Sequence, residues 1–254
     1  MVEERFSTGV KELDDLLGGG VQKGVNILVR GGTGTGKTTF SLQYLVEGAR
    51  LGERGMYLTF EESAGQIVKY GSRFFPDLKS HIETGTLQIL DFSPLTMSAG
   101  KTRMVEGERV SIPEKEFVDS TTYIDVKIKD IRGQTIRRVV IDGLQTFATT
   151  FYDLSGKRDS DELRRTLSRI LVMLKKEDIT TYILSEEVDE QTDRYEFANF
   201  SVDGVFVMKV NEALDMRMMR ILKMRGISHT LKPLAIQLID GKGVVIVDHQ
   251  KGRI

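Results

Sequence analysis

One stretch of this chain, residues 25 to 40, limits its fold more than any other. An apolar run rich in β-branched residues ends at Gly31, and residues 31 to 38 then fit the P-loop pattern G-x-x-x-x-G-K-[ST] in full. The glycines of a P-loop let the backbone turn its N–H groups inward around a phosphate, and the positive end of the following helix adds to the attraction. Phosphate contacts are therefore expected from the loop and the first helical turn, namely Gly32, Thr33, Gly34, Thr35, Gly36, Lys37, Thr38 and Thr39.

Two residues of this loop are suited to bind a nucleoside triphosphate and its metal ion. We expect the Lys37 ammonium to reach the β- and γ-phosphates and to stabilise the charge that develops in phosphoryl transfer. We expect the Thr38 hydroxyl to bind Mg²⁺. The dinucleotide pattern G-x-G-x-x-G fails on spacing, because a pattern that starts at Gly32 needs a glycine where Lys37 stands.

Length and composition bound the class of protein. A chain of 254 residues can form one large α/β domain or two small ones, and we favour a single domain over residues 1–254. The formal net charge of −1 gives no overall attraction to nucleic acid or to anionic lipid, and the lack of cysteine excludes disulfides and thiolate metal sites. Neither a signal peptide nor an apolar run of about 18 residues is present, so we expect a cytoplasmic location without membrane insertion.

Two carboxylates follow the strand pattern that comes after the P-loop. Residues 56–60 have the pattern of a strand, Glu61 and Glu62 come next, and Ser63 with Gln66 forms a capping box that starts a helix. The carboxyl ends of strands are where α/β sheets place their active sites. We therefore expect at least one of the two glutamates to orient or deprotonate an attacking water. The alternative is that acidic residues merely stabilise the N-terminus of a helix.

A second nucleotide-binding signature lies at residues 137–144, where an apolar strand ends in Asp142. We expect this carboxylate at the Mg²⁺ site, either as a direct ligand or one contact removed from the ion. The alternative is that Asp142 only starts a turn before Gly143, which is common for an Asp-Gly pair.

The remaining patterns indicate the fold class. Before the P-loop, a short amphipathic helix is expected to bury Val10, Leu13, Leu16 and Leu17. The C-terminal third predicts strands at 204–210, 217–224, 234–239 and 244–247. The last two of these strands are joined around Asp240-Gly241, which is a strong hairpin signal. The order of elements predicts an α/β fold of the P-loop NTPase type, with a central, mostly parallel sheet that is flanked by helices and extended by antiparallel C-terminal strands.

Segment 93–136 is the least regular part of the chain and has the character of an insertion. A small hairpin is expected around Glu106-Gly107. At 121–134 we expect a helix, because a parallel sheet needs a crossover before its next strand. Further along, Asp159 and Glu162 form a capping box for the clearest helix, whose solvated face carries Arg164, Arg165 and Arg169.

Five motifs occur in order along the chain. They are Ser-Thr-Gly-Val-Lys-Glu-Leu-Asp-Asp-Leu-Leu-Gly-Gly-Gly from Ser7, Gly-Thr-Gly-Lys-Thr-Thr-Phe from Gly34, Thr-Phe-Glu-Glu-Ser from Thr59, Val-Val-Ile-Asp from Val139, and Ile-Leu-Lys-Met-Arg-Gly-Ile-Ser-His from Ile221. Together they resemble the KaiC-type ATPase domain of the RecA superfamily, and the resemblance covers nearly the whole chain except about residues 93–136.

This resemblance implies a ring, commonly a hexamer, with ATP or ADP and Mg²⁺ held between neighbouring subunits. Glu61 and Glu62 match the paired catalytic glutamates of the family. The residues that match contacts from one subunit to the nucleotide of the next are Lys223, Arg225 and His229, with Asp240 as a further contact at that interface. The circadian clock protein of the family has two such domains in tandem, whereas this chain has one, so a clock function does not follow.

The strand pattern adds a geometric expectation for two of these residues. Lys223 and Arg225 occupy alternating positions, so their side chains should project to the same side and could act together on phosphate charge. The alternative is that they are surface cations on an edge strand, which discourage aggregation.

Three functions are compatible with these residues. The first is an ATP-hydrolysing ring whose nucleotide state regulates a protein partner. The second is an ATP-sensing scaffold with negligible turnover. The third is a recombinase- or helicase-like DNA-dependent ATPase. Residues 186–200 argue against DNA, because they hold six carboxylates and one cation where recombinases of this superfamily contact a strand. The observation that favours DNA is a basic cluster of Lys127, Lys129, Arg132, Arg137 and Arg138.

Overall fold

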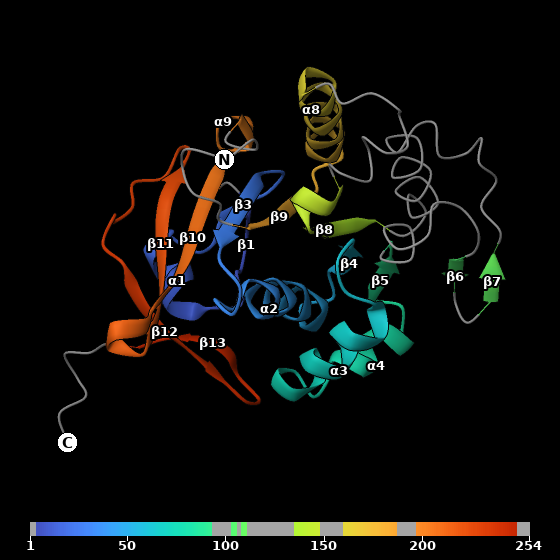
Figure 1. Ribbon diagram of the computed structural model, residues 1–254, viewed down its shortest axis with the longest axis horizontal. Helices are drawn as coiled ribbons and strands as arrows, with labels where there is room; N and C mark the ends of the chain where they lie inside the picture. Colours follow the sequence, from blue (N-terminus) through green and yellow to red (C-terminus); the bar gives the residue numbers. More distant parts are fainter. Residues whose placement is uncertain are drawn as a thin grey trace.

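The computed structural model describes residues 4–92, 103–105, 108–110, 135–147, 160–186 and 197–247. Within these ranges the central sheet consists of β3 (Asn26–Gly31), β4 (Arg54–Thr59), β5 (Leu87–Asp91), β8 (Ile136–Asp142), β9 (Thr180–Glu186), β10 (Gly204–Asn211), β11 (Met216–Met224), β12 (Leu234–Ile239) and β13 (Gly243–Ile246). The strands lie in the order β13-β12-β11-β10-β3-β9-β8-β4-β5 (Figure 1). The strand that precedes the P-loop, β3, therefore lies inside the sheet.

The direction of the strands places the site. Strands β10, β3, β9, β8, β4 and β5 run parallel, and β11, β12 and β13 continue the sheet in antiparallel fashion from β10. The predicted fold class is confirmed. Because parallel strands share one direction, their carboxyl ends meet at one edge of the sheet. The residues that end β3, β4, β8 and β9 at this edge are Gly31, Thr59, Asp142 and Glu186.

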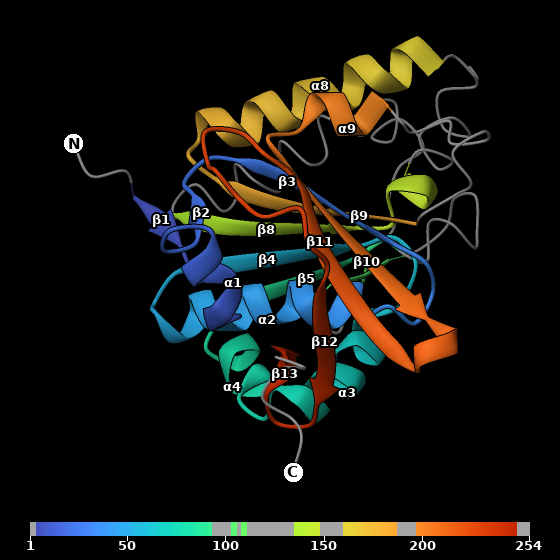
Figure 2. The same cartoon turned by 90° about the vertical axis from the view of Figure 1, so that its left-hand side faces the viewer.

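Helices cover both faces of the sheet (Figure 2). One face carries α1 (Lys11–Leu16), α2 (Lys37–Arg50), α3 (Ala64–Phe74) and α4 (Leu78–Glu83), and the other carries α8 (Ser160–Lys176) and α9 (Phe197–Ser201). Alternate side chains of a strand point to opposite faces, so Ile27 and Val29 of β3 join the core under α2 while Leu28 joins the core under α8. None of the described helices combines the length and apolar character needed to cross a bilayer.

Smaller elements complete the described chain. Strands β1 (Arg5–Phe6) and β2 (Val21–Gln22) form an antiparallel pair on either side of α1 in the sequence, and a short 3₁₀ turn (Glu212–Leu214) links β10 to β11. The predicted hairpin is confirmed as β6 (Arg103–Val105) paired with β7 (Glu108–Val110). Its two turn residues, the helix predicted at 121–134 and the capping residue Asp159 lie outside the described residues.

The predicted helix boundaries and faces are mostly confirmed. The Ser63–Gln66 capping box is present at the start of α3. Arg164, Arg165 and Arg169 are exposed on α8, as expected. The prediction was wrong for Leu16, which is 37% exposed, whereas Val10, Leu13 and Leu17 are buried. The reason is that α1 has only six residues and ends at Leu16, where three glycines with positive φ turn the chain.

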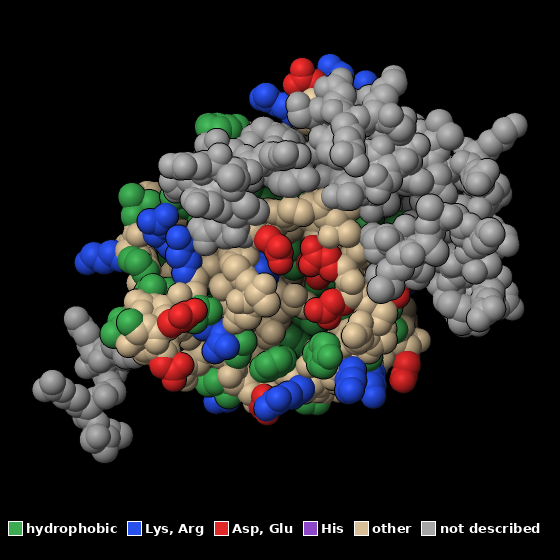
Figure 3. Space-filling model, viewed as in Figure 1, with side chains coloured by type: hydrophobic (Ala, Val, Ile, Leu, Met, Phe, Trp, Pro, Cys, Tyr) green, Lys and Arg blue, Asp and Glu red, His purple; other side chains and the backbone are tan. Residues whose placement is uncertain are grey.

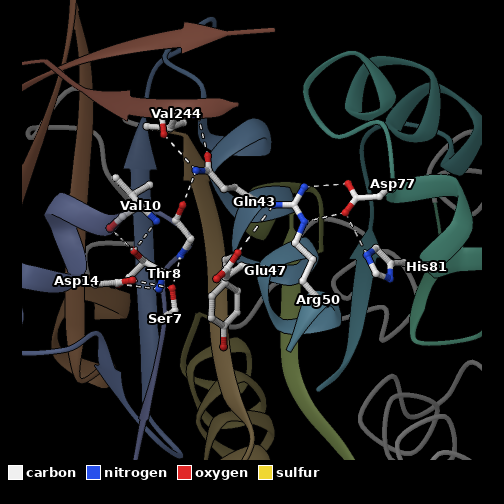
Figure 4. A network of polar contacts seen from close by, with 12 residues as sticks. Ser7, Thr8, Val10, Asp14, Gln43, Glu47, Arg50, Asp77, His81 and Val244 are labelled. Atoms are coloured by element: carbon white, nitrogen blue, oxygen red, sulfur yellow. Dashed lines mark hydrogen bonds and ion pairs between the residues drawn. The ribbon is translucent and has the colours of Figure 1, made fainter. Parts of the chain in front are cut away.

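The P-loop helix α2 is fixed by a buried amide (Figure 4). Gln43 Nε2 donates to Gly9 O (2.6 Å) and Val244 O (3.1 Å), and Gln43 Oε1 accepts from Val244 N (2.7 Å). Gly9 itself lies in a turn in which Asp14 accepts hydrogen bonds from the Ser7 hydroxyl and the Thr8 amide. One side chain of α2 thus joins the N-terminal segment to the last strand of the sheet.

A second polar group holds α2 against the sheet. Arg138 of β8 is fully buried, with Nε 2.5 Å from Glu53 Oε2 and Nη1 donating to Ser7 O (2.6 Å) and Tyr44 O (2.8 Å). Its guanidinium lies 4.5 Å from the centre of the Tyr44 ring, which adds a cation–π contact. Gly48 leaves the space, since a Cβ there would lie 2.3 Å from Arg138 Nε.

This burial corrects one reading of the sequence. The sequence places Arg138 in a basic cluster that could contact DNA. Its guanidinium is fully buried and paired with Glu53, so it cannot contact DNA. Lys127, Lys129 and Arg132 of that cluster lie outside the described residues. The sequence could not reveal the burial. Arg137 and Arg138 have the same charge and point to opposite faces of one strand, and the sequence does not show which of the two is covered.

We predict that Arg138→Ala lowers the free energy of unfolding by about 3–5 kcal/mol, because it leaves Glu53 and two backbone carbonyls without their donor. Urea denaturation monitored by circular dichroism measures the change. Arg137→Ala on the same strand is the control, with an expected loss below about 1 kcal/mol. Equal denaturation midpoints for the two variants would contradict the structural role of Arg138.

Candidate nucleotide-binding site

The P-loop bends tightly between β3 and α2. Gly34 and Gly36 have φ values of 74° and 100°, which strain any side chain, and Gly36 is the residue from which α2 starts. A Cβ at Gly31 would lie 2.5 Å from Met208 O, and one at Gly36 would lie 3.0 Å from Leu238 Cδ2. The loop therefore needs glycine at Gly36 for two reasons: its conformation and the strand packed against it.

The polar side chains of the loop are held by its own backbone. Lys37 Nζ donates to Gly31 O (2.7 Å) and Gly32 O (3.0 Å), and Thr35 Oγ1 donates to Gly32 O (2.8 Å). Burial lowers the pKa of Lys37, and the carboxylates of Glu186, Asp142 and Glu61 oppose this shift. The ammonium therefore lies among three acidic groups at the edge of the sheet.

Asp142 is a buried carboxylate. Asp142 is 6% exposed, and its Oδ2 accepts a hydrogen bond from the Tyr57 hydroxyl. Burial raises the pKa of Asp142 to about 7; the Glu61 and Glu62 charges add to the increase, whereas the Tyr57 hydrogen bond and Lys37 oppose it. Asp142 is thus the last residue of β8 at the edge where the P-loop lies, and its place at the Mg²⁺ site stays a prediction.

The two glutamates have different surroundings. Glu61 Oε1 accepts from Thr146 Oγ1 (3.2 Å), and its side chain lies over Gly143, where a Cβ would be 2.8 Å from Glu61 Cγ. Burial raises the pKa of Glu61, with Thr146 and Lys37 opposing and Glu186 and Glu62 adding. Glu61 is therefore the glutamate that is positioned and that interacts with Lys37.

Glu62 points to a different place. Its backbone is fixed by Thr59, whose Oγ1 donates to Glu62 O (2.6 Å) and accepts from Glu62 N (3.2 Å). Its side chain lines a cavity of about 180 Å³ between α2 and α3, together with Thr38, Thr39, Leu42, Ile67, Tyr70, Gly71 and Phe74.

This edge of the sheet is acidic. In Figure 3 acidic side chains gather at the centre of the face, and the exposed carboxylates at the ends of β4 and β9 belong to Glu61, Glu62 and Glu186. No group of three or more histidine or acidic residues in the described part of the chain could hold a metal by itself. The donor set fits Mg²⁺ in a nucleotide complex, because this ion takes one or two protein oxygens and completes its shell with phosphates and water. The Thr38 hydroxyl and the Asp142 carboxylate are the oxygens that the sequence predicts for this role.

The four residues assigned by resemblance lie in β11, in the loop after it and in the turn between β12 and β13. Lys223 pairs with Val205 near the start of β10, whereas the P-loop follows the end of the adjacent β3. Asp240 forms an ion pair with Arg73 of α3 (2.9 Å) in the turn between β12 and β13. His229 Nδ1 is 3.2 Å from Thr230 O in the loop after β11, and Arg225 lies just after the end of that strand.

Lys223 and Arg225 project to the same side, as predicted. Lys223 Nζ donates to Asn199 O (2.9 Å) and Val202 O (2.7 Å), and Arg225 Nη2 donates to Phe200 O (3.3 Å) at the end of α9. A β-bulge opposite Val205 and Phe206 turns Lys223 away from the face on which Ile221 is buried. Whether they reach a neighbouring subunit stays a prediction.

Sequence reasoning missed three residues of the site. Arg217 Nε donates to Gly34 O at the tip of the P-loop (2.9 Å). Tyr57 and Thr146 contact Asp142 and Glu61, respectively. The available signal was position alone: Tyr57 precedes the acidic pair and Thr146 follows Asp142, but which side chains meet depends on the pairing of β4 with β8.

We predict that Asp142→Asn stabilises the protein near pH 8 when Mg²⁺ and nucleotide are absent. The pKa of Asp142 is higher in the folded chain than in the unfolded chain, so ionisation removes stability as the pH rises from about 4 to about 7. Asparagine abolishes this loss and keeps an acceptor for Tyr57. Thermal unfolding should show an advantage of about 2–4 kcal/mol near pH 8 that shrinks toward pH 4. A difference that does not change with pH would contradict the assignment.

Comparison with known families matches residues 6–251 to the KaiC ATPase family. The circadian clock oscillator protein KaiC of Parathermosynechococcus lividus is 34% identical over 87% of this chain, but this chain spans only 38% of that protein. A UPF0273 protein of Pyrococcus horikoshii is 29% identical, over 95% of this chain and 93% of its own length.

The fold comparison agrees. The crystal structure of a KaiC-like protein from Pyrococcus horikoshii superposes with a TM-score of 0.75 at 26% identity, covering 97% of this chain and all of that one. The family match extends over nearly the whole chain and includes the P-loop, the acidic pair and the strand that ends in Asp142. The chain belongs to the KaiC-type ATPase family.

Proposed function

We propose that this protein hydrolyses ATP in a homo-oligomeric ring, with a hexamer as the expected form, and that its nucleotide state regulates a protein partner in the cytoplasm. The observation that carries the proposal is the meeting of three strand ends at one edge of the sheet, because β3 leads into the P-loop, β8 ends at Asp142 and β4 is followed by Glu61. These are the parts that phosphoryl transfer to water needs.

Each residue has a role in the proposed reaction. The P-loop amides and Lys37, released from the carbonyls of Gly31 and Gly32, bind the β- and γ-phosphates. Mg²⁺ held by Thr38 and Asp142 would compensate the charge on the phosphate oxygens. The Glu61 carboxylate accepts a proton from water, while the Thr146 hydroxyl fixes its orientation.

The choice of Glu61 over Glu62 rests on its surroundings. Thr146 and the space above Gly143 define the position of Glu61, and partial burial raises its pKa, which favours a base. Glu62 faces the cavity beside Thr39, where it is better placed to exclude or bind other parts of the nucleotide.

The positions of Lys223 and Arg225 support a ring. Lys223 and Arg225 do not face the P-loop of their own chain, and they lie side by side at the end of α9. Together with His229 and Asp240 they would contact the nucleotide of a neighbouring subunit and stabilise charge on its phosphates.

We predict that Glu61→Gln lowers kcat by about 100-fold or more and leaves ATP binding within about threefold, because glutamine cannot accept the proton. Glu62→Gln should cost less than about tenfold in kcat. Phosphate release measured with purified protein, together with equilibrium binding of ATP, checks both. If Glu62→Gln were the more damaging change, the roles of the two glutamates would be exchanged.

The same measurement separates an enzyme from a scaffold. Steady phosphate release that disappears in Lys37→Ala supports hydrolysis, and its absence in the wild-type protein at saturating MgATP would leave an ATP-sensing scaffold. Mass in solution, measured with and without MgATP, tests the ring, because a monomer under both conditions excludes it.

We predict that mixing two inactive variants restores activity if the site lies between subunits. Lys37→Ala lacks a working P-loop but keeps Arg225, and Arg225→Ala has the opposite defect, so mixed rings contain some complete interfaces. Disassembly and reassembly of the mixture should raise phosphate release several-fold over either variant. The matched control is Lys37→Ala mixed with Glu61→Gln, whose defects lie in the same half of the site and should not complement. Equal results for the two mixtures would contradict a site shared between subunits.

A further inference from the structure

Tyr57 is a fully buried residue whose hydroxyl reaches the proposed metal site. Its ring belongs to the core under α2, on the same face of the sheet as Val140 of the adjacent strand β8. Figure 1 shows that α2 crosses this part of the sheet beside β4. A buried tyrosine usually finds a partner for its hydroxyl, and the partner of Tyr57 is the predicted metal ligand Asp142.

The phenol joins the two residues that would hold Mg²⁺. Tyr57 Oη donates to Asp142 Oδ2, and the Thr38 side chain interacts with the same phenol and lowers its pKa. Thr38 comes from α2, Asp142 from β8 and Tyr57 from β4. A third element therefore fixes the other two relative to each other.

The direction of this chain of hydrogen bonds follows from its chemistry. A carboxylate that binds Mg²⁺ is ionised and can only accept, so in the metal-bound site the Tyr57 proton must point to Asp142. The phenol oxygen is then left as an acceptor, and the neighbouring Thr38 hydroxyl is a donor that can fill it. A threonine hydroxyl that donates its single proton in this way keeps its lone pairs free, and lone pairs are what a cation requires.

The same contact limits the freedom of Asp142. Its Oδ2 is bonded to Tyr57, so the carboxylate cannot rotate away without breaking the hydrogen bond of a buried hydroxyl, and Oδ1 remains for other partners. Partners that orient the ligands of a metal in this way typically contribute about 10- to 100-fold to its affinity.

We propose that Tyr57 is a positioning residue for Mg²⁺: it orients the Thr38 hydroxyl and the Asp142 carboxylate toward one point and thereby sets the affinity of the site for the metal of MgATP. The proposal rests on the proposed nucleotide-binding function. It differs from a packing role, because packing would support nucleotide binding equally with and without the metal.

Another buried tyrosine provides a matched control. Tyr182 of β9 is fully buried in the same core, and its hydroxyl has no hydrogen-bond partner among the described residues. Removal of that hydroxyl deletes one oxygen from the same core without touching Thr38 or Asp142.

The experiment is a Mg²⁺ titration of nucleotide binding by the full chain. Affinity for a fluorescent N-methylanthraniloyl ATP is measured in EDTA and at increasing Mg²⁺ for the wild type, Tyr57→Phe and Tyr182→Phe. We predict that Tyr57→Phe binds the probe within about twofold of wild type in EDTA but needs about 10- to 100-fold more Mg²⁺ for half of the metal-dependent gain. Tyr182→Phe should follow the wild type throughout.

Other results overturn the inference in distinguishable ways. A Mg²⁺ titration of Tyr57→Phe that coincides with wild type removes the positioning role and leaves the proposed function intact. An equal loss in EDTA and in Mg²⁺ shows that Tyr57 acts through packing alone. A wild-type protein that binds no probe under either condition overturns the proposed function and this inference with it.

A second comparison keeps the test valid if Tyr57→Phe proves unstable. Asp142→Asn removes the buried charge, so Tyr57→Phe in that background leaves no carboxylate unpaired and should fold. If Tyr57 acts through Asp142 and Thr38 as a unit, its substitution adds less to the Mg²⁺ requirement of Asp142→Asn than to that of wild type. Full additivity of the two changes would overturn the proposal.

Discussion

The close approach of the P-loop backbone to the C-terminal strands is the constraint on which the rest of the structure depends. Gly31 lies so near Met208 of β10, and Gly36 so near Leu238 of β12, that a Cβ at either position would collide with its neighbour or press against it. Strands β10 and β12 therefore pack directly against the backbone of the loop and help to fix its conformation. The antiparallel extension of the sheet is in this sense part of the nucleotide site.

Around this loop, the carboxylates outnumber the cations that oppose them. Asp142 is buried with Glu61 and Glu62 nearby, and Lys37 is the cation that faces them. An arrangement of this kind costs folding free energy and gains function, because a phosphate-bound cation and the lysine can meet carboxylates that are already in place. Tyr57 and Thr146 reduce the cost by donating hydrogen bonds to the acids, and both fix the direction in which these acids point.

The P-loop helix is held by segments from both ends of the chain. Gln43 connects α2 to the turn at Gly9 and to Val244 of β13, and the Arg138 guanidinium connects it through Tyr44 to β8 and to Ser7. These buried polar contacts are directional, so they fix the rotation of α2 as well as its distance from the sheet. The first turn of that helix, with Lys37 and Thr38, is positioned accordingly.

The sequence by itself determined the elements whose signals are local. The P-loop, the capping box at Ser63, the apolar strand before Asp142 and the order of strands and helices follow from turn chemistry and periodicity over a few residues, and they sufficed for the fold class and for the core of the site. Only the tertiary structure decided which of the two glutamates is positioned, that Arg138 is buried, that a bulge redirects Lys223, and that Tyr57 donates to Asp142. These features depend on strand register and on which face of the sheet each residue occupies, and both are set by the packing of segments that lie far apart in the chain.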